Sequence, residues 1–222
     1  MGISLIITTY NRSILLARSL KRIAQLTKPD EIIVVDDGGD DGCREMCRLT
    51  IDRTHLPIRY EWIDHRGETT PCRARNIALD LVSHEQIVVS EPELLFSSDV
   101  IGQMRRLRME YRDDVLHEKE CLHQPYIDSH VDELNTVPGF YVNAYMKQWL
   151  VDIGGWDENF PGSWAWDDLD LFNRLEYSGH KRRPFEQIRV LHQWHPSRIE
   201  PAVENEAYIR AKEFPRDLVA NR

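Results

Sequence analysis

The feature that most constrains the fold is the alternation of strand-like runs and helical patterns through roughly the first ninety residues. Short strand-like runs occupy positions 3–8, 31–37, 58–63 and 86–90. Between the first two runs, Leu16, Leu20 and Ile23 recur at helical spacing, and residues 73–82 form another helical pattern. Near-continuous apolar strands separated by helices are typical of a parallel sheet buried on both faces. The sequence therefore predicts an α/β fold with a mostly parallel sheet and helices on both faces.

The later part of the chain is less regular. A helix is predicted around residues 102–112, and a polar, poorly periodic segment from about 113 to 138 follows it. Strand-like residues return at 139–146 and 187–192, and a helix with an acidic first turn is predicted over 166–177. Because long connections in compact domains are usually functional or mobile, the segment 113–138 is a candidate functional region.

Length and charge limit the classes of protein that fit. A chain of 222 residues suits a single domain, and its net charge of −9 argues against a broad nucleic-acid binder. The N-terminal apolar run is too short for a signal peptide or a membrane span, so we expect a cytoplasmic chain with no membrane span. The four cysteines lack C-x-x-C spacing and are expected to be free thiols.

Ligands of parallel α/β sheets bind at the carboxyl ends of the strands, near the point where the strand order reverses. The first strand ends in TTYNR (8–12), which supplies hydroxyls, an aromatic face and a cation. This segment could receive a base or a phosphate, or Asn11 could simply cap the following helix.

The second strand ends in VVDDGGDDG (34–42). A calcium loop starting at Asp37 is excluded because Gly39 and Arg48 stand where ligands are needed, and no G-x-G-x-x-G follows a strand. The remaining interpretations are an acceptor for the polar edge of a ligand and a solvated acidic turn. Further along, RARN (73–76) places two arginines and free backbone donors at the start of a helix.

The fourth strand ends in SEPE (90–93), where Glu91 and Glu93 would project to the same side of an extended chain. Two like charges at one point favour a cation between them, and carboxylates suit Mg²⁺ or Mn²⁺. Near the end of the last predicted strand, His192 and His195 are further candidate ligands. An exposed strand end and structural histidines are the alternative interpretations.

The segment WAWDDLDL (164–171) sets Asp167 and Asp168 behind Trp164 and Trp166. A carboxylate beside an indole wall is a plausible general base, because partial removal from water raises its pKa. Tryptophan is also a common stacking surface for sugar rings. The alternative is an ordinary acidic first turn of a helix.

Taken in order, ITTYNR, VVDDGGDDG, ARNIAL, SEPE, GGWDENF and WAWDDLDL resemble the glycosyltransferases with the GT-A fold, specifically the inverting glycosyltransferase family 2. The resemblance covers roughly residues 3 to 195. It implies a single GT-A-like domain over 1–222, with a nucleotide-sugar-binding half at about 1–95, an acceptor-side half at about 96–200 and a tail at 201–222.

The resemblance also implies roles for individual residues. Asp36 or Asp37 would accept from the uracil edge, and Arg73 or Arg75 would contact the nucleotide. The full set of donor-binding candidates is Thr8, Tyr10, Arg12, Asp36, Asp37, Arg73, Arg75 and Trp166. Glu91 and Glu93 fall where the family carries its Asp-x-Asp metal motif, with both aspartates replaced by glutamate. His192 or His195 could complete the metal shell.

In the same family, Asp168 would be the catalytic base, with Asp167 beside it. The implied activity is inverting transfer from a nucleotide sugar, most simply a UDP-sugar, to an acceptor hydroxyl, assisted by Mn²⁺ or Mg²⁺. The acceptor could be a saccharide, a lipid-linked sugar or a protein, and the acidic charge makes a nucleic-acid acceptor less favoured. A non-catalytic nucleotide-sugar-binding or partner domain of the same fold is the alternative. A nucleotidylyltransferase fits less well, since TTYNRS is not a glycine-rich phosphate loop.

Overall fold

The computed structural model describes residues 2–67, 71–123, 135–138, 140–162, 165–196, 203–214 and 218–220. The strands of the main sheet are β1 (Ile3–Thr9), β2 (Glu31–Asp36), β3 (Ile58–Trp62), β4 (Gln86–Ser90), β6 (Val115–Glu118), β9 (Asn143–Met146) and β10 (Arg182–Phe185). The strands of a smaller sheet are β5 (Leu94–Phe96), β7 (Glu120–His123), β8 (Asn135–Pro138) and β11 (Val190–His192). The helices are α1 (Ser13–Leu26), α2 (Cys43–Thr54), α3 (Cys72–Leu81), α4 (Val100–Glu110), α5 (Lys147–Asp152), α6 (Asp167–Tyr177) and α7 (Val203–Arg210).

The main sheet has the order β10-β6-β9-β4-β1-β2-β3. Strands β1 to β4 are parallel to one another, whereas β9 runs antiparallel to both β4 and β6. The chain therefore builds outward from β1 to β3 and then returns to the other side of β1 to form β4. The strand order reverses between β1 and β4, so the carboxyl ends of these two strands are where the fold predicts a site.

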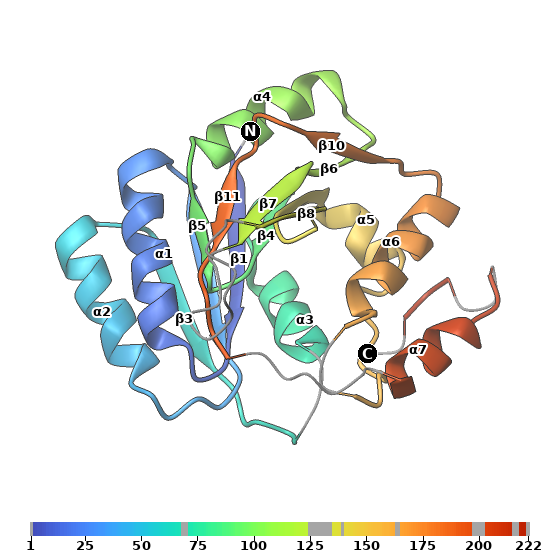
Figure 1. Ribbon diagram of the computed structural model, residues 1–222, viewed down its shortest axis with the longest axis horizontal. Helices are drawn as coiled ribbons and strands as arrows, with labels where there is room; N and C mark the ends of the chain where they lie inside the picture. The colour runs from blue at the N-terminus through green and yellow to red at the C-terminus, as the bar shows by residue number, and fades with distance from the viewer. Residues whose placement is uncertain are drawn as a thin grey trace.

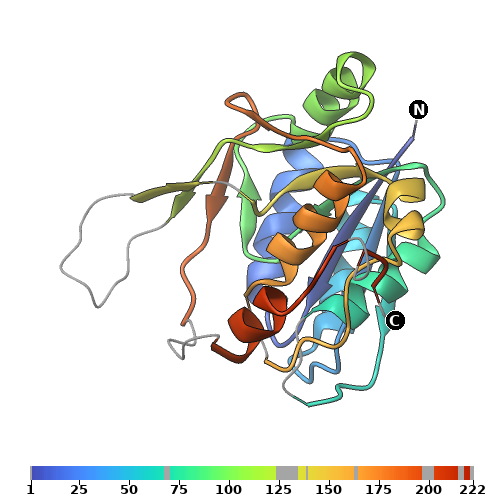
Figure 2. The same ribbon diagram turned by 90° about the vertical axis from the view of Figure 1, so that its right-hand side faces the viewer.

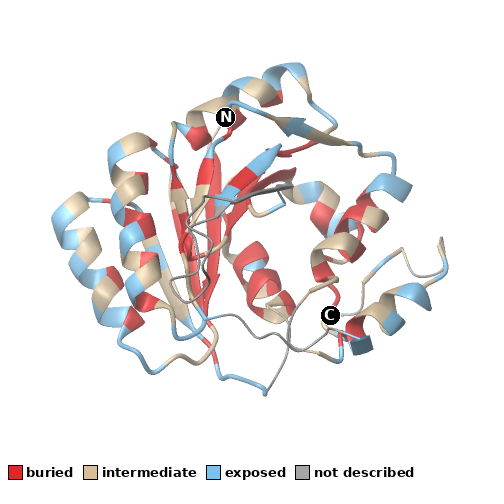
Figure 3. Cartoon of the chain, viewed as in Figure 1, coloured by how far each residue is buried: buried red, intermediate tan, exposed pale blue. Residues whose placement is uncertain are grey.

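Helices cover both faces of the sheet, with α1 and α2 on one side and α3 and α6 on the other (Figure 1). Side chains of β1 alternate between the faces, which gives two core clusters. The cluster under α1, α2 and α4 includes Ile3, Leu5, Ile7, Leu16, Leu20, Cys47 and Met104. The cluster under α3, α5 and α6 includes Ile6, Ile33, Ala78, Leu79, Leu150, Leu171 and Phe172. The central strands β1, β2 and β4 are buried along most of their length, as Figure 3 shows, whereas the edge strands β3 and β10 are partly exposed.

The segment 113–138, expected to be irregular, contains β6, β7 and β8. Sequence periodicity missed these strands because each is only four residues long, too short for an alternating pattern. Strands β7 and β8 pair antiparallel and project from the body of the molecule (Figure 2). Part of the expected connection, residues 124–134, lies outside the described residues.

The C-terminal tail is fixed to the body by buried charges. Lys212 Nζ lies 2.5 Å from Asp157 Oδ2 and 2.6 Å from Asp170 Oδ1, and all three side chains are almost fully buried. Arg174 Nε donates to the other oxygen of Asp170, and the Tyr208 hydroxyl donates to Asp157. Buried charges are tolerated only when paired and hydrogen-bonded, so the segment after α7 completes a network that α6 begins.

We expect Lys212→Met to lower the free energy of unfolding by about 3–5 kcal/mol, because it leaves Asp157 and Asp170 with less compensating charge in the interior. Urea denaturation followed by circular dichroism measures the change. The control is Arg210→Met, since Arg210 is 73% exposed and its ion pair with Glu206 lies on the surface; the control should change stability by no more than about 0.5 kcal/mol. Equal effects of the two substitutions would contradict the buried network.

Candidate active site

One buried arginine joins three acidic side chains at the strand-order reversal. Arg75, in the first turn of α3, donates to Glu91 at 2.6 Å, to Asp167 at 2.6 Å and to Asp168 at 3.1 Å. The Arg75 residue is only 3% exposed. Its guanidinium therefore ties together the start of α3, the end of β4 and the first turn of α6, and it offsets the repulsion among the carboxylates.

Asp168 is the most accessible member of this group. Its side chain is 44% exposed, whereas that of Asp167 is 6% exposed. Withdrawal from water, together with the negative charges of Asp167 and Glu91, raises the pKa of Asp168 to about 7 against the lowering effect of the Arg75 charge. A carboxyl with this pKa, reachable from solvent, has the properties of a general base near neutral pH.

A second cluster lies around Glu93. The Nε2 atoms of His192 and His195 lie 3.6 Å and 3.4 Å from Glu93 Oε1. Arg12 Nη1 donates to the same oxygen at 2.6 Å and lies 3.2 Å from His195 Nε2. Burial opposes ionisation, but contacts with the two histidines and Arg12 hold the pKa of Glu93 well below its ordinary value. The carboxylate of Glu93 is therefore surrounded by the side-chain nitrogens of Arg12, His192 and His195.

Among the described residues, Glu93, His192 and His195 form a group compact enough to hold a metal ion, with candidate ligand atoms within 4.8 Å of one another. The expectation that Glu91 and Glu93 converge on one point differs from this arrangement, because Glu91 pairs with Arg75. The physical reason is local: β4 ends at Ser90, and the chain then turns with Leu94 N donating to Glu91 O. The two-residue alternation holds only for extended chain.

The fold brings the histidines to Glu93 through the smaller sheet. Strand β11 pairs antiparallel with β5, and His192 stands opposite Leu94. Gln193 N also donates to Glu93 O at 3.0 Å. Residues about one hundred positions apart in the sequence are thus placed in contact by backbone pairing.

The ends of β1 and β2 carry the predicted nucleotide contacts. Tyr10 is 43% exposed and stacks on His65, with ring centroids 4.3 Å apart and planes within 6°. His65 Nδ1 lies 3.2 Å from Asp37 Oδ2, and Arg73 Nη1 lies 3.9 Å from Asp37 Oδ1. Gly38 permits this approach, since its φ is +81° and a Cβ there would meet His65.

The two aspartates of this turn have different surroundings. Asp36 is 1% exposed and accepts from the Tyr60 hydroxyl at 2.7 Å and from Gly39 N at 2.8 Å. Burial raises the pKa of Asp36, although these hydrogen bonds oppose the rise. Asp37 keeps its carboxylate near the stacked rings, so it is the better placed of the two to meet a ligand.

The other predicted residues serve the frame of the site. Thr8 is buried within β1, and Trp166 packs against the core cluster of α3 and α6. Asn11 does not cap α1; its Oδ1 accepts from Asp40 N, while Asp41 accepts from Ser13 N. Sequence reasoning missed His65 as a member of the site, and its only signal was an aromatic residue in the loop after the third strand.

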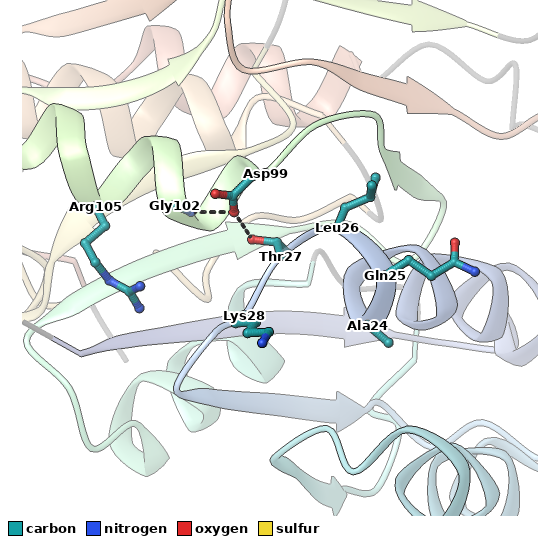
Figure 4. A pocket seen from close by; sticks show the side chains of 8 residues that line it. All are labelled: Ala24, Gln25, Leu26, Thr27, Lys28, Asp99, Gly102 and Arg105. Carbon is teal, nitrogen blue, oxygen red and sulfur yellow. Dashed lines mark hydrogen bonds between the residues drawn. The ribbon is translucent and has the colours of Figure 1, made fainter.

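A hollow of about 320 Å³ lies elsewhere, between the end of α1 and the start of α4 (Figure 4). Asp99 Oδ1 there accepts from Thr27 Oγ1 and from Gly102 N. Because α1 starts beside the carboxyl end of β1 and ends before β2 begins, this hollow lies at the edge of the sheet opposite to Arg75 and Glu93. None of the candidate site residues lines it.

Residues 4–116 of this chain match the model of glycosyl transferase family 2. The match spans just over half of the 222 residues, and the chain belongs to this family. Chondroitin sulfate synthase 3 of Homo sapiens and that of Mus musculus are each 32% identical over 72 residues, which is 32% of this chain and 8% of theirs. The match thus covers less than a tenth of the length of these relatives.

Solved glycosyltransferases share the fold. The mannosyltransferase PcManGT from Pyrobaculum calidifontis, in complex with GDP-Man and Mn²⁺, superposes with a TM-score of 0.66 at 16% identity over 86% of this chain and 56% of its own. TarS from S. aureus in complex with UDP gives 0.67 at 17% identity over 88% and 61%. GalNAc-T7 with UDP, GalNAc and Mn²⁺ gives 0.70 at 12% identity over 87% and 44%. The predicted GT-A fold and glycosyltransferase class are confirmed.

The comparisons carry no test of the individual site residues, whose roles stay predictions. Among the described residues, no helix is long and apolar enough to cross a membrane.

We expect Arg75→Met to lower the free energy of unfolding by about 3–5 kcal/mol at pH 8, because Glu91 and Asp167 lose their buried partner. Burial raises the folded-state pKa of Glu91 and of Asp168, so these two carboxyls destabilise the fold when they are forced to ionise. The loss of stability should therefore shrink as the pH falls from 8 to 5 and they take up protons. Urea denaturation at several pH values measures both effects.

The control is Arg48→Met on α2, where Arg48 is 59% exposed and pairs with Glu45 and Asp52 at the surface. Its effect should be small and should not vary in the same way with pH. If Arg75→Met is as stable as Arg48→Met, the buried ion pairs of Arg75 do not contribute to the stability of the fold.

Proposed function

We propose that this domain is an inverting glycosyltransferase that moves a sugar from a nucleotide-sugar donor, a UDP-sugar, to an acceptor hydroxyl. The single observation that carries the proposal is Asp168, a half-exposed carboxyl whose pKa is about 7. Arg75 contacts both Asp168 and Glu91, the residue that follows β4. Family membership and the fold support the reaction class. TarS with UDP-GlcNAc, at a TM-score of 0.67 and 16% identity, supports the choice of a uridine donor.

The proposed reaction consists of one proton transfer and one displacement. The acceptor hydroxyl attacks the anomeric carbon while Asp168 accepts the hydroxyl proton, and the bond between the anomeric carbon and the nucleoside diphosphate breaks. A single displacement inverts the anomeric carbon. Arg75 keeps Asp168 oriented and, by its charge, limits the rise in the pKa of that carboxyl.

The nucleotide would bind at the ends of β1 and β2. Tyr10 offers a stacking face, Asp37 an acceptor for the polar edge of the base, and Arg73 a nearby cation. Because His65 already stacks on Tyr10 and contacts Asp37, the base would either replace the imidazole on this face or bind on the opposite face of Tyr10. Asp36 would not contact the base; it would stabilise the turn that carries Asp37 by accepting a hydrogen bond from Gly39 N.

The residues around Glu93 fit a divalent ion. Among the described side chains, Glu93 Oε2 is buried without a hydrogen-bond partner, and two imidazoles converge on the neighbouring oxygen. Glu93, His192 and His195 would hold Mn²⁺ or Mg²⁺, and such an ion would neutralise charge on the departing diphosphate. Mixed nitrogen and oxygen ligands favour Mn²⁺ over Mg²⁺. PcManGT and GalNAc-T7 were each solved with Mn²⁺.

The acceptor site would lie on the side formed by residues after β5. This half contains the projecting β7 and β8 strands, and a saccharide, a lipid-linked sugar or a protein would be the acceptor. Surface substitutions in the β7–β8 region that keep the pairing of β7 with β11 should spare donor hydrolysis and abolish transfer.

The experiment that tests the proposal is a screen of nucleotide sugars for binding and slow hydrolysis with Mn²⁺, Mg²⁺ or a chelator present. Binding and hydrolysis of a UDP-sugar are expected. Binding without hydrolysis or transfer would favour the non-catalytic domain, and the absence of binding by every nucleotide sugar would refute the proposal.

We expect Asp168→Asn to retain UDP binding and to lose turnover by a factor of roughly 10²–10⁴, because the amide cannot accept the hydroxyl proton. In the unsubstituted protein, the rate should rise with pH and level off above about 7, since only the ionised carboxylate is a base. Calorimetry with UDP and a hydrolysis assay with UDP-GlcNAc measure the two properties. Asp52→Asn, on the exposed face of α2, is the matched control; unchanged turnover in Asp168→Asn would show that another group is the base.

Two substitutions test whether Arg12 and a divalent ion compete for Glu93. Glu93→Gln should weaken Mn²⁺ binding, whereas Arg12→Ala should strengthen it by about tenfold or more, because the Arg12 cation donates a charge-assisted hydrogen bond to Glu93 Oε1, the oxygen that both imidazoles approach. Titration of Mn²⁺ followed by electron paramagnetic resonance reads binding without turnover. Weaker binding in Arg12→Ala would show that Arg12 supports the ion rather than competing with it.

A further inference from the structure

Asn205 in α7 is fully buried and contacts backbone just before α6. Its Oδ1 accepts from Gly162 N at 2.7 Å, and its Nδ2 lies 3.3 Å from Gly162 O and 3.1 Å from Ala165 O. One amide side chain thus satisfies backbone groups of two residues in the segment that leads into the helix of Asp168. A Cβ at Gly162 would lie 3.0 Å from Asn205 Oδ1, so the contact is close.

The backbone that Asn205 holds is strained. Ala165 and Trp166 have φ values of 65° and 72°, although neither is glycine. Each such residue costs about 1–2 kcal/mol, and the conformation persists only where surrounding contacts impose it. Strain of this kind is concentrated at functional sites, and here it directly precedes Asp167 and Asp168.

The helix that carries Asn205 is itself well fixed. Tyr208, one turn later, donates to Asp157, and Lys212 bridges Asp157 and Asp170 of α6. Asn205 therefore acts from a rigid support. The first backbone hydrogen bond of α6 runs from Asp170 N to Trp166 O at 2.9 Å, so a change at Trp166 would be transmitted into the first helical turn.

We propose that Asn205 is a positioning residue for Asp168: by holding the left-handed conformation at Ala165, it sets the direction in which α6 begins and hence where the carboxyl of Asp168 points. Arg75 fixes the same turn from the opposite side through its contacts with Asp167 and Asp168. The inference rests on the proposed role of Asp168 as the base, and it assigns the C-terminal helix a part in the reaction.

The expected effect lies in turnover. Misplacing a reacting group by about 1 Å can lower a rate by roughly 10²-fold. The Asn205 hydrogen bonds described above go to the backbone before α6, whereas UDP would bind at the ends of β1 and β2. We expect Asn205→Ala to lower kcat for UDP-GlcNAc hydrolysis by about 10- to 100-fold, with the KM and the Kd of UDP changed by no more than about twofold. The kcat is calculated per folded molecule, with the folded fraction measured by circular dichroism, because loss of folded protein alone would also lower the apparent kcat without changing the KM.

Two further variants sharpen the comparison. Asn205→Asp keeps an acceptor for Gly162 N but places an oxygen against the carbonyls of Gly162 and Ala165, so it should also lose turnover. Glu206→Gln changes the neighbouring residue, which is half-buried and pairs with the exposed Arg210, and it should behave as the unsubstituted protein. If Asn205→Ala does not fold, Asn205→Ser, which retains a short acceptor, takes its place.

Hydrogen exchange reads the same effect without turnover. The peptide covering residues 165–171 should exchange faster in Asn205→Ala than in Glu206→Gln, while the later part of α6 stays protected. Unchanged kcat in folded Asn205→Ala, a loss confined to UDP affinity, or unchanged exchange at 165–171 would overturn the inference.

The double variant separates this inference from the proposed function. If Asp168 is the base that Asn205 positions, Asn205→Ala should lower kcat little further in an Asp168→Asn background. Full turnover in Asp168→Asn alone would refute the base assignment, whereas a slow Asp168→Asn with a fully active Asn205→Ala would refute the positioning role only.

Discussion

The buried guanidinium of Arg75 is the interaction on which the site depends. Glu91, Asp167 and Asp168 come from the end of a strand and the start of a helix, and without a cation their mutual repulsion would push these elements apart. Arginine suits this position better than lysine, because its planar group carries several donors in fixed directions. The same contacts leave Asp168 half exposed and Asp167 buried, so only one of these two adjacent aspartates is readily reached from solvent.

Much of the fold was predictable from the sequence, because strands buried on both faces show as apolar runs. Residues 3–8, 31–37 and 86–90 were identified on that ground, and they correspond to β1, β2 and β4. Strands β6, β7 and β8 were missed, since four residues carry too little pattern. The parallel sheet with helices on both faces was confirmed, and its strand order reverses between β1 and β4, next to the candidate site residues.

The candidate site was predictable as a set of residues but less so as a set of contacts. Sequence position indicated that Glu91 and Glu93 follow the end of the fourth strand, and the family resemblance implied that Asp168 is the base. Sequence position could not show that the chain turns after Ser90. This turn separates the two glutamates and allows Glu91 to form an ion pair with Arg75. Nor could spacing reveal Asn205 or His65, because their partners are distant in the sequence and are reached only through the packed fold.

The charge balance of the site connects these contacts to donor binding. A nucleoside diphosphate is an anion, and an edge that already holds several carboxylates would repel it unless cations intervene. Arg75 is committed to three carboxylates in the interior, whereas the Arg12 side chain is 35% exposed and contacts one. Under the proposed function, two arrangements of Arg12 near Glu93 are compatible with donor binding. In one, a divalent ion displaces Arg12 from Glu93; in the other, Arg12 stays in contact with Glu93 and is itself the cation that faces the diphosphate. In the first case a displaced Arg12 stays within reach of the donor, because its backbone is anchored at the start of α1. The two glutamates that the family resemblance aligns with a metal motif therefore differ in their partners, because Glu93 contacts His192, His195 and Arg12 while Glu91 contacts Arg75.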